Sequence, residues 1–301
     1  MKMILMFIDG IGIGKNDLLN PFMKANIPNW HSFFNNYSVF EADASLGVTG
    51  LPQSATGQTS IYTGKNAPKA VGRHISARPT ATLAEMVNND NIFKILIDRG
   101  YSVTFVNVYS KDYLDEVGKN PKGMLKPSVT TLLNISAALP FRTVEDYKNG
   151  NGVYHDITGE ALREKGYDVP VITPEKAADN LYQISRNYDF TLFEFFVSDL
   201  AGHSQNMDRA VSILERLDRF VGSLVKQMDL NKEVFVIVSD HGNIEDLSIP
   251  THTMNPVPVF FITNTKTFPK NKITAITDIL PAVLDFFPKK NRLKHIPSKS
   301  G

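Results

Sequence analysis

Residues 234–238 form an unbroken run of apolar side chains that is followed closely by Asp240, His241 and Gly242. A short apolar run without polar alternation is typical of a strand buried on both faces, as in the parallel sheet of an α/β protein. Open α/β sheets bind their ligands beyond the carboxyl ends of such strands. An adjacent Asp and His there suit Zn²⁺ or Mn²⁺, because they offer a hard oxygen and a borderline nitrogen. The alternative is a turn that closes the strand and leaves His241 solvated.

Two more apolar runs end in the same way. Residues 4–8 lead directly into Asp9, and residues 190–197 lead into Asp199, with His203 four residues later. In a mostly parallel sheet the carboxyl ends of the strands share one edge, so residues far apart in the chain can meet there. We therefore expect these acids to converge with Asp240.

Histidines and a hydroxyl group extend this predicted cluster. His203 and His241 lie beside the strand ends, and His252 lies in a proline-containing loop just before another apolar run at 259–262. The chain has no cysteine, so disulfides and thiolate ligands are excluded and any metal must bind oxygen or nitrogen. Three acids, three imidazoles and a hydroxyl suffice for two ions, which can stabilise the entering and leaving oxygens of a displacement at phosphorus.

A hydroxyl-rich loop runs from residue 50 into a predicted helix start near Ser54 and Thr56. Ser54 is a plausible N-cap, and the amino end of a helix attracts phosphate or sulfate through unpaired N–H groups. Simple capping by Ser54 or Thr56 is the alternative to a functional role.

Charge and length limit the classes of protein that this chain can belong to. Its net charge of +1 gives no electrostatic case for binding nucleic acid or an anionic membrane. No apolar run approaches membrane-spanning length, and residues 1–8 are too short for a signal peptide. With 301 residues the chain can form one large α/β domain or two smaller ones. We expect a soluble cytoplasmic protein.

Between the acid-ending strands the pattern predicts helices and one irregular stretch. We expect a helix over 82–99 that stops at Gly100, and a buried strand over 103–108. Residues 110–168 show no regular pattern and are rich in lysine, proline and glycine. They are predicted to form an insertion or lid, with an ordinary surface excursion as the alternative.

Taken together, these motifs resemble those of the alkaline phosphatase superfamily, most closely the cofactor-independent phosphoglycerate mutases and phosphopentomutases. The motifs follow the family's order: Asp9, Ser54, Asp199-x-x-x-His203, Asp240-His241-Gly and His252-Thr-x-Asn-Pro-Val-Pro. The resemblance covers residues 1–64 and 170–290. It implies a three-layer α/β/α sandwich around a mostly parallel sheet, formed by a single domain over 1–301 with a small insertion.

The resemblance also implies the roles of individual residues. One ion would be held by Asp199, His203 and His252, and a second by a set consisting of Asp9, Asp240, His241 and the Ser54 oxygen. Ser54 is preferred over Thr56 as nucleophile because it precedes Gly57 by three residues, as in the family. The donor types admit both Mn²⁺ and Zn²⁺.

The chain departs from the mutases at two places. Gln58 follows Gly57, where the mutases carry a histidine, and 110–168 is shorter than the cap domain of the phosphoglycerate mutases. We therefore predict a phosphoester hydrolase that acts on a small phosphorylated substrate through a phosphoserine. A phosphomutase and a non-catalytic metal-binding descendant are the alternatives. Arg73 and Arg78 are candidates for a clamp on the substrate phosphate, with solvated surface arginines as the alternative.

Overall fold

The computed structural model describes residues 1–119, 127–265, 269 and 272–290. Its centre is a six-stranded sheet in the order β2-β8-β7-β1-β6-β3. The strands are β1 (Lys2–Ile8), β2 (Ser38–Ala42), β3 (Val103–Phe105), β6 (Phe190–Phe195), β7 (Glu233–Ser239) and β8 (Val257–Ile262). β8 is antiparallel to both of its neighbours, and the other pairings are parallel. The mostly parallel sheet that the sequence predicts is confirmed.

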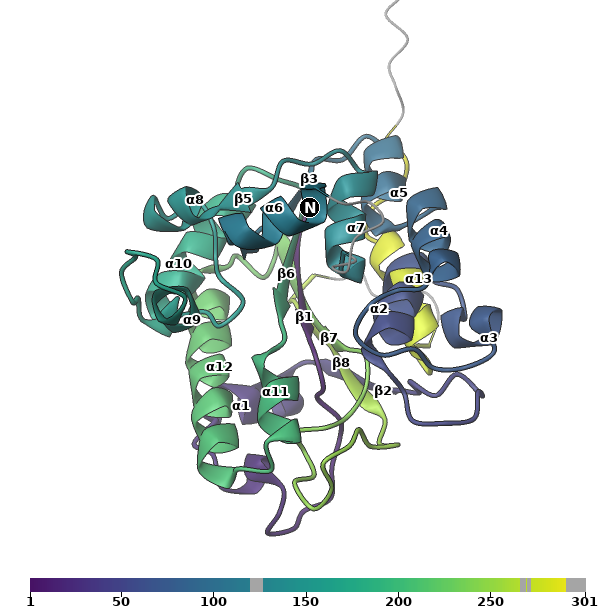
Figure 1. The fold of residues 1–301 in the computed structure, drawn as a ribbon, viewed down its shortest axis with the longest axis vertical. Helices are drawn as coiled ribbons and strands as arrows, with labels where there is room; N and C mark the ends of the chain where they lie inside the picture. The colour runs from purple at the N-terminus through teal and green to yellow at the C-terminus, as the bar shows by residue number, and fades with distance from the viewer. Residues whose placement is uncertain (120–126, 266–268, 270–271, 291–301) are drawn as a thin grey trace, which may run out of the picture.

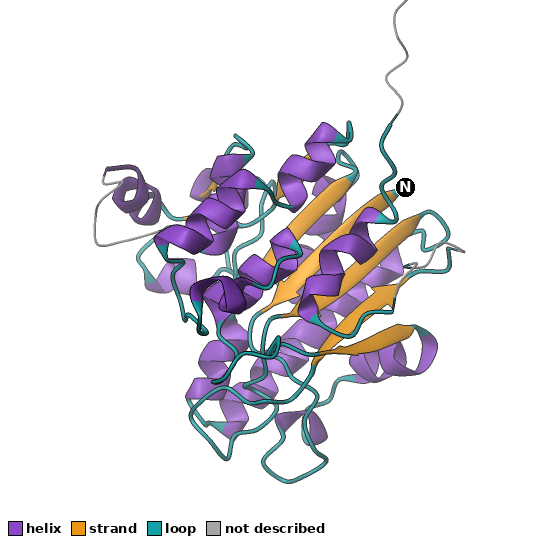
Figure 2. Cartoon of the chain, turned by 90° about the vertical axis from the view of Figure 1, so that its right-hand side faces the viewer, coloured by secondary structure: helices purple, strands orange, loops and turns teal. Residues whose placement is uncertain are grey.

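Helices cover both faces of this sheet, as Figures 1 and 2 show. One face is covered by α2 (Ser54–Thr63), α3 (Ala67–Val71), α4 (Ala81–Asn89), α5 (Ile92–Asp98), α7 (Val129–Ser136) and α13 (Ile279–Leu284). The other is covered by α1 (Pro28–Asn36), α10 (Pro174–Ser185), α11 (Val197–His203) and α12 (Met207–Gln227). The predicted three-layer sandwich is therefore confirmed. Among the described helices none has the length and hydropathy needed to span a bilayer.

The two central strands explain the unbroken apolar runs of the sequence. In β1 alternate side chains enter the two separate cores: Met3, Leu5 and Phe7 on the α2 side, and Ile4, Met6 and Ile8 on the α12 side. The same alternation holds along β7. Because each fully buried side chain of this size contributes about 1.5–3 kcal/mol, a polar residue within these strands would be costly.

Two elements differ from the sequence-based prediction. The helix expected over 82–99 is broken into α4 and α5, because the Asn91 side chain accepts hydrogen bonds from the backbone of Phe93 and Lys94 and so starts a new helix. The strand expected over 103–108 pairs with β6 only to Phe105. After one further backbone bond, from the Val106 N–H to the Leu192 carbonyl, the Asn107 side chain replaces the backbone as the hydrogen-bonding partner of β6.

The stretch 110–168 contains α6 (Lys111–Lys119), α7, β5 (Arg142–Thr143), α8 (Val144–Lys148) and α9 (Glu160–Glu164), and residues 120–126 lie outside the described part. Helix α7 packs in the main core on the α2 side. Strand β5 pairs with β4 (Val108–Tyr109), and a small third core forms around Tyr147, Tyr154 and Leu162. This stretch is thus divided: α7 belongs to the main core, and the part around Tyr147, Tyr154 and Leu162 has a core of its own. The remaining short helices are η1 (Pro21–Met23) and η2 (Ile276–Asp278).

Candidate metal centre and active-site cavity

Strand register brings the first two acids together. Ile8 of β1 pairs with Ser239 of β7, so Asp9 and Asp240 follow at the same level on adjacent parallel strands. Both carboxylates are buried. The convergence predicted for these two acids therefore follows from the pairing of two central strands.

Helix α11 supplies the third acid and one imidazole. Asp199 and His203 lie four residues apart, on one face of the helix, and His203 Nε2 is 3.3 Å from Asp199 Oδ2. Asn243, which follows β7, donates a hydrogen bond of 2.6 Å to Asp199 Oδ1. The helix thereby presents two donor groups toward the strand ends.

His252 reaches the same edge because β8 is antiparallel. The amino end of β8 lies where the other strands have their carboxyl ends, so the loop before it returns to the site. A bridge between Gly242 and Thr253 fixes this loop beside the end of β7. The rings of His252 and His241 stack, with centroids 3.7 Å apart.

Ser54 lies at the first residue of α2, so the expectation that it is the N-cap is wrong by one position. Gln53 occupies the cap and makes no side-chain capping bond. The Ser54 hydroxyl instead lies 3.0 Å from His241 Nε2. Thr56, the other candidate hydroxyl, donates to the Gln53 carbonyl and accepts from the Ile75 N–H, so its oxygen is occupied elsewhere.

Four of the predicted ligands therefore surround one point. His241 Nε2 lies 3.0 Å from Ser54 Oγ, 3.1 Å from Asp9 Oδ1 and 3.7 Å from Asp240 Oδ2. Ligands about 2.1 Å from a tetrahedral ion lie roughly 3.4 Å from one another. These spacings match one cation held by the set that the sequence resemblance implies for the second ion.

The other three predicted ligands also lie together. His252 Nε2 is 3.5 Å from Asp199 Oδ1 and 3.2 Å from His203 Nε2. Asp199, His252 and His241 form a second group of donor atoms that all lie within 4.8 Å of one another. His241 is thus shared between the two groups of donors, a feature that spacing in the sequence does not reveal.

The backbone orients two of the imidazoles for binding a cation. His252 Nδ1 is 2.7 Å from the Pro52 carbonyl oxygen, and His203 Nδ1 is 2.9 Å from that of Pro250. Because a carbonyl oxygen only accepts, Nδ1 carries the hydrogen, and in the neutral ring the Nε2 lone pair is free. Two such lone pairs facing one another favour a positive ion between them.

The charges of the buried carboxylates also fit a cation. Asp9 Oδ1 and Asp240 Oδ2 are buried and accept no well-aligned hydrogen bond from any described residue, although His241 Nε2 lies 3.1 and 3.7 Å away. Burial raises the pKa of Asp9 and, with the Asp9 charge adding to it, raises that of Asp240 well above its usual range. A divalent cation is the group that compensates such buried, unpaired charges.

The histidines respond to the same charges. Burial alone would lower the pKa of His241, but the carboxylates of Asp240 and Asp9 outweigh it and raise that pKa to about 10. Burial, together with the His241 charge, lowers the pKa of His252 to about 4, which keeps this ring neutral near pH 7. The protein alone therefore places a positive charge at the centre of its carboxylates, where a metal ion can replace it.

Glu245 ties together the loops that carry these ligands. Its buried carboxylate accepts hydrogen bonds from the backbone N–H groups of Gly12 and Asn243, both at 2.8 Å. It also accepts from Thr253 Oγ1 at 2.6 Å and from Asn255 Nδ2 at 3.1 Å. The segments after β1, after β7 and before β8 are thus held by one side chain. The sequence analysis did not single out this residue, and an acid shortly after the Asp-His pair is the signal that it offers.

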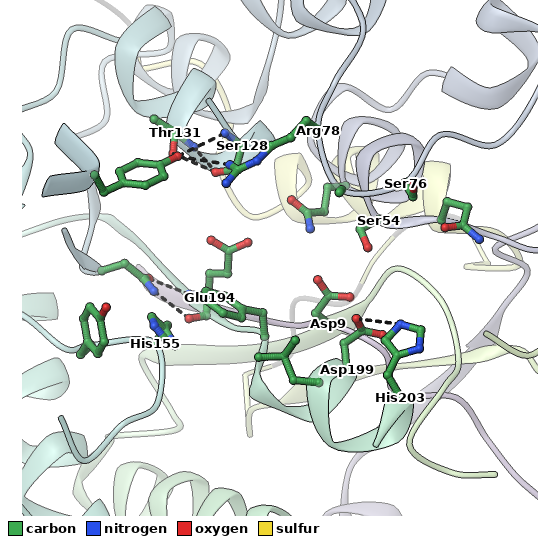
Figure 3. Close-up of a pocket in the computed structure, with 18 of the residues that line it drawn as sticks. Asp9, Ser54, Ser76, Arg78, Ser128, Thr131, His155, Glu194, Asp199 and His203 are labelled. Atoms are coloured by element: carbon green, nitrogen blue, oxygen red, sulfur yellow. Dashed lines mark hydrogen bonds and ion pairs between the residues drawn. The ribbon is translucent and has the colours of Figure 1, made fainter. Parts of the chain in front are cut away.

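A cavity of about 730 Å³ opens beside the metal-ligand cluster. One end is lined by five of the predicted site residues: Asp9, Ser54, Asp199, His203 and His252. The other end is mainly aromatic and contains an acid: Tyr109, Tyr113, Tyr154, His155, Phe196 and Glu194. Figure 3 shows both ends in one view.

The two candidate arginines lie in different places. Arg78 lines the cavity and donates a hydrogen bond of 3.3 Å to the hydroxyl of Tyr113. Arg73 is exposed and is not among the residues that line the cavity. The structure therefore brings Arg78, but not Arg73, to the site.

Glu194 is a site residue that the sequence analysis did not identify. It lies in β6 on the face of Phe190 and Leu192, where an apolar residue would be usual, and is only 9% exposed. Burial raises its pKa to about 7, and a hydrogen bond from Thr130 opposes the rise. The available signal was an acid within an apolar strand, because carboxyl groups are almost never fully buried without a partner.

Comparison with known proteins agrees with the candidate metal centre. The family model described as the Metalloenzyme superfamily matches residues 1–291. Over 199 residues the chain is 29% identical to a 2,3-bisphosphoglycerate-independent phosphoglycerate mutase of Malacoplasma penetrans. That match covers 62% of this chain and 38% of the relative, and the chain spans well under half the length of the other curated mutases compared.

Solved structures share the fold at low identity. Phosphoglycerate mutase of Leishmania mexicana superimposes with a TM-score of 0.59 at 10% identity, over 99% of this chain and 97% of that one. Alkaline phosphatase of the Antarctic bacterium TAB5 superimposes with a TM-score of 0.58 at 14% identity, over 94% and 97%. The predicted resemblance to the alkaline phosphatase superfamily is confirmed.

Proposed function

Because this chain belongs to the metalloenzyme superfamily, we propose that it is a two-metal phosphoryl-transfer enzyme, and specifically a phosphoester hydrolase. The observation that carries the proposal is the position of the Ser54 hydroxyl. It lies 3.0 Å from His241 Nε2, within a cluster of buried carboxylates, at the floor of a large cavity. A serine hydroxyl is a weak nucleophile at neutral pH unless its surroundings favour loss of the proton.

The start of α2 favours a phosphate group beside this hydroxyl. The first N–H groups of a helix have no partner within the helix, and Gln53 supplies no side-chain cap. The Thr56 N–H donates to the Ile75 carbonyl and the Gly57 N–H to that of Gln53. The N–H groups of Ser54 and Ala55, with the positive end of the helix dipole, would therefore bind the phosphate oxygens. Ser54 would then lie against the phosphorus that it attacks.

We assign the ligands of two divalent ions as the resemblance implies. Asp9, Asp240, His241 and the Ser54 oxygen form one set, and the other consists of Asp199, His203 and His252. When bound, such ions stabilise the charge on the attacking and leaving oxygens of an in-line displacement. Mn²⁺ and Zn²⁺ both suit these oxygen and nitrogen donors.

The reaction has two steps at one phosphorus. Ser54 Oγ loses its proton to solvent and forms a bond to phosphorus while the ester P–O bond breaks, and the alcohol leaves after taking up a proton. A water molecule then attacks the phosphoserine, the Oγ–P bond breaks, and inorganic phosphate leaves while Ser54 regains a proton. Asn243, through its bond to Asp199, and Glu245, through its bonds to three loops, keep the ligands in place during both steps.

A phosphomutase is the second candidate, because the curated relatives carry that name. A mutase must hold the dephosphorylated product for the return transfer. We propose that 110–168, which supplies Tyr113, Tyr154 and His155 to the cavity wall, acts as a small insertion over the organic part of the substrate. A cytoplasmic location remains our expectation from the sequence.

The Ser54→Ala substitution tests the hydrolase mechanism. We expect it to abolish release of phosphate from p-nitrophenyl phosphate while the content of bound Mn²⁺ or Zn²⁺ stays nearly unchanged, because the other ligands remain. Thr56→Ala is the matched control, since its hydroxyl contacts backbone groups outside the cluster, and it should keep turnover. Unchanged activity in Ser54→Ala would remove this residue from the mechanism.

The same assay separates the alternatives. A mutase would convert a phosphosugar or phosphoglycerate into its isomer without releasing phosphate. A non-catalytic metal-binding protein would bind ions yet turn over no phosphate ester with either metal.

A further inference from the structure

The part of the cavity that Glu194, the tyrosines and His155 line offers polar and aromatic surface to the organic part of a substrate. The cavity volume, about 730 Å³, falls in the range that encloses drug-sized ligands. A three-carbon phosphate held at Ser54 would leave much of this space unfilled. The side chains that line the remaining space therefore indicate which larger organic group can bind there.

Glu194 is the one carboxylate among the residues that line this part of the cavity, and one of its oxygens is open to a ligand. Oε2 accepts a hydrogen bond of 2.7 Å from Thr130, whereas no described residue donates to Oε1. Asn107 holds the backbone of Glu194 with bonds of 2.7 and 2.8 Å, so the strand cannot easily turn the side chain away. Figure 3 shows its carboxyl group projecting into the cavity. This oxygen is open to the cavity, so a ligand that displaces water from it has to supply a hydrogen-bond donor in its place.

Hydroxyl groups and one cation lie near Glu194. Thr131 Oγ1 contacts the hydroxyls of Tyr109, Tyr113 and Ser128 at 3.2, 3.0 and 2.8 Å. Arg78 donates to Tyr113, and no carboxylate among the described residues forms an ion pair with it. This end thus offers both donors and acceptors, the combination that a group with several hydroxyls can satisfy.

Flat aromatic rings form the rest of the wall. Tyr109 and Tyr113 stack with centroids 5.4 Å apart, and His155 and Phe196 stack with centroids 4.1 Å apart. In the view of Figure 3, Thr131, which contacts the first pair, and His155 lie on either side of Glu194. Such faces offer apolar area against which the flat side of a ring can pack.

Building on the proposed phosphoryl transfer, we propose that Glu194 is a specificity-determining residue that selects phosphate esters whose organic group is a hydroxylated ring. A ring hydroxyl donates its hydrogen to Glu194 Oε1, and Arg78 and the neighbouring hydroxyls bind the other ring oxygens. An ammonium group would also satisfy Glu194, but the positive charges of Arg78 and Lys165 at this end oppose it. An apolar ring would leave Oε1 unpaired.

Two esters of the same ring size test this proposal: α-D-glucose 1-phosphate, which carries ring hydroxyls, and cyclohexyl phosphate, which carries none. Dissociation constants are measured by calorimetry with Mn²⁺-loaded Ser54→Ala protein, which binds an ester without consuming it. We expect the glucose ester to bind at least about tenfold more tightly, because cyclohexyl phosphate displaces water from Glu194 Oε1 without supplying a hydrogen-bond donor. Equal binding of the two esters would overturn the proposal.

Substitution of Glu194 tests whether the preference for the glucose ester depends on this residue. Glu194→Leu, added to Ser54→Ala, should remove most of the preference for the glucose ester while leaving the affinity for cyclohexyl phosphate nearly unchanged. Unchanged affinity for the second ester also shows that the variant is folded. Glu41→Gln, on an exposed position of β2, is the control and should change neither constant. A loss of affinity by the same factor for both esters in Glu194→Leu would contradict the assignment.

A different result would show that the proposed phosphoryl-transfer function is wrong while the role of Glu194 is right. If the wild-type protein binds the glucose ester preferentially through Glu194 but neither releases phosphate from it nor isomerises it, the selection by Glu194 stands and the phosphoryl-transfer proposal fails.

Discussion

Individual residues in this protein occupy positions that are unfavourable without a ligand. Asp9 and Asp240 are buried side by side, and each has a carboxyl oxygen with no well-aligned hydrogen bond from the described residues. Taking charge out of water costs several kcal/mol, so such an arrangement persists only if a positive group compensates it. Without an ion that group is His241, a single positive charge between two carboxylates. A cation at the site does so, which is why these unpaired oxygens are stronger evidence for metal binding than the residue types alone.

Glu194 gives a prediction at this scale. Its pKa is raised by burial from 4.5 to about 7 in the folded protein, so the folded state binds its proton more tightly than the unfolded state does. The stability that it contributes is fully present below pH 4.5 and is lost as the pH rises to about 7. We expect the free energy of unfolding of the wild type, relative to Glu194→Gln, to fall by about 3 kcal/mol over this interval.

Urea unfolding of both proteins at several pH values between 4.5 and 8, with a chelator present, measures this difference. The comparison removes the contribution of groups that titrate in both proteins. A difference between the wild type and Glu194→Gln that stays constant with pH would show that the carboxyl group is not held in the way described here.

Among the elements, the contact of α2 with the end of β7 positions Ser54, the proposed nucleophile. A Cβ atom at Gly57 would lie 2.7 Å from Asp240 Cβ and 2.9 Å from the Asp240 carbonyl oxygen. Only glycine lets the helix approach this closely, and the approach sets Ser54 against His241. The spacing of three residues between Ser54 and Gly57 therefore has a physical cause, because one turn of helix links the nucleophile to the contact point.

Substitution of Gly57 tests that contact. In an exposed helix Gly→Ala stabilises by about 0.5–1 kcal/mol, but here the added methyl group meets backbone that cannot easily move. We expect Gly57→Ala to destabilise the protein by about 1–3 kcal/mol and to lower turnover, because α2 and Ser54 are displaced. Gly57→Val should have a larger effect on both quantities. Denaturant unfolding and phosphate release measure them, and a more stable, fully active Gly57→Ala protein would disprove the close packing.

The direction of β8 is the second decisive feature at the scale of elements. Were β8 parallel to β7, the loop before it would lie at the opposite edge of the sheet, and His252 could not reach Asp199. Its antiparallel pairing with β7, in the register Phe235 with Ile262, places this histidine against His241 instead. The local sequence around His252 does not contain this information.

At the scale of the whole molecule, the ligands come from segments between residue 9 and residue 252, so ions at the site would link both halves of the chain. We expect removal of divalent ions with a chelator to lower the melting temperature by several degrees. An ion present at 100 times its dissociation constant adds about 2.7 kcal/mol of stability. Thermal unfolding with and without Mn²⁺ measures the effect.

The matched control for this experiment is Asp9→Asn combined with Asp240→Asn. This variant lacks two carboxylate ligands of one ion but keeps Asp199, His203 and His252, so Mn²⁺ should raise its melting temperature by less than it raises that of the wild type. If the wild type melted at the same temperature with and without the ion, the ligand cluster would not bind Mn²⁺ in the folded state.

The sequence by itself determined the class of fold and predicted the candidate ligand residues that the structure brings together. A strand buried on both faces must be apolar along its length, so β1 and β7 are recognisable, and a polar residue can follow only where the strand leaves the core. That constraint marks Asp9 and Asp240 without any knowledge of their neighbours. It also explains why the mostly parallel sheet could be predicted.

Only the tertiary structure decided how these residues pair and what surrounds them. Strand order, register and the direction of β8 depend on contacts between distant segments, which local patterns do not encode. These contacts make His241 common to both groups of donors, exclude Arg73 from the cavity and turn Glu194 toward it. Glu194 is a candidate site residue because it faces the cavity, and that cavity forms only when distant segments of the chain have folded together.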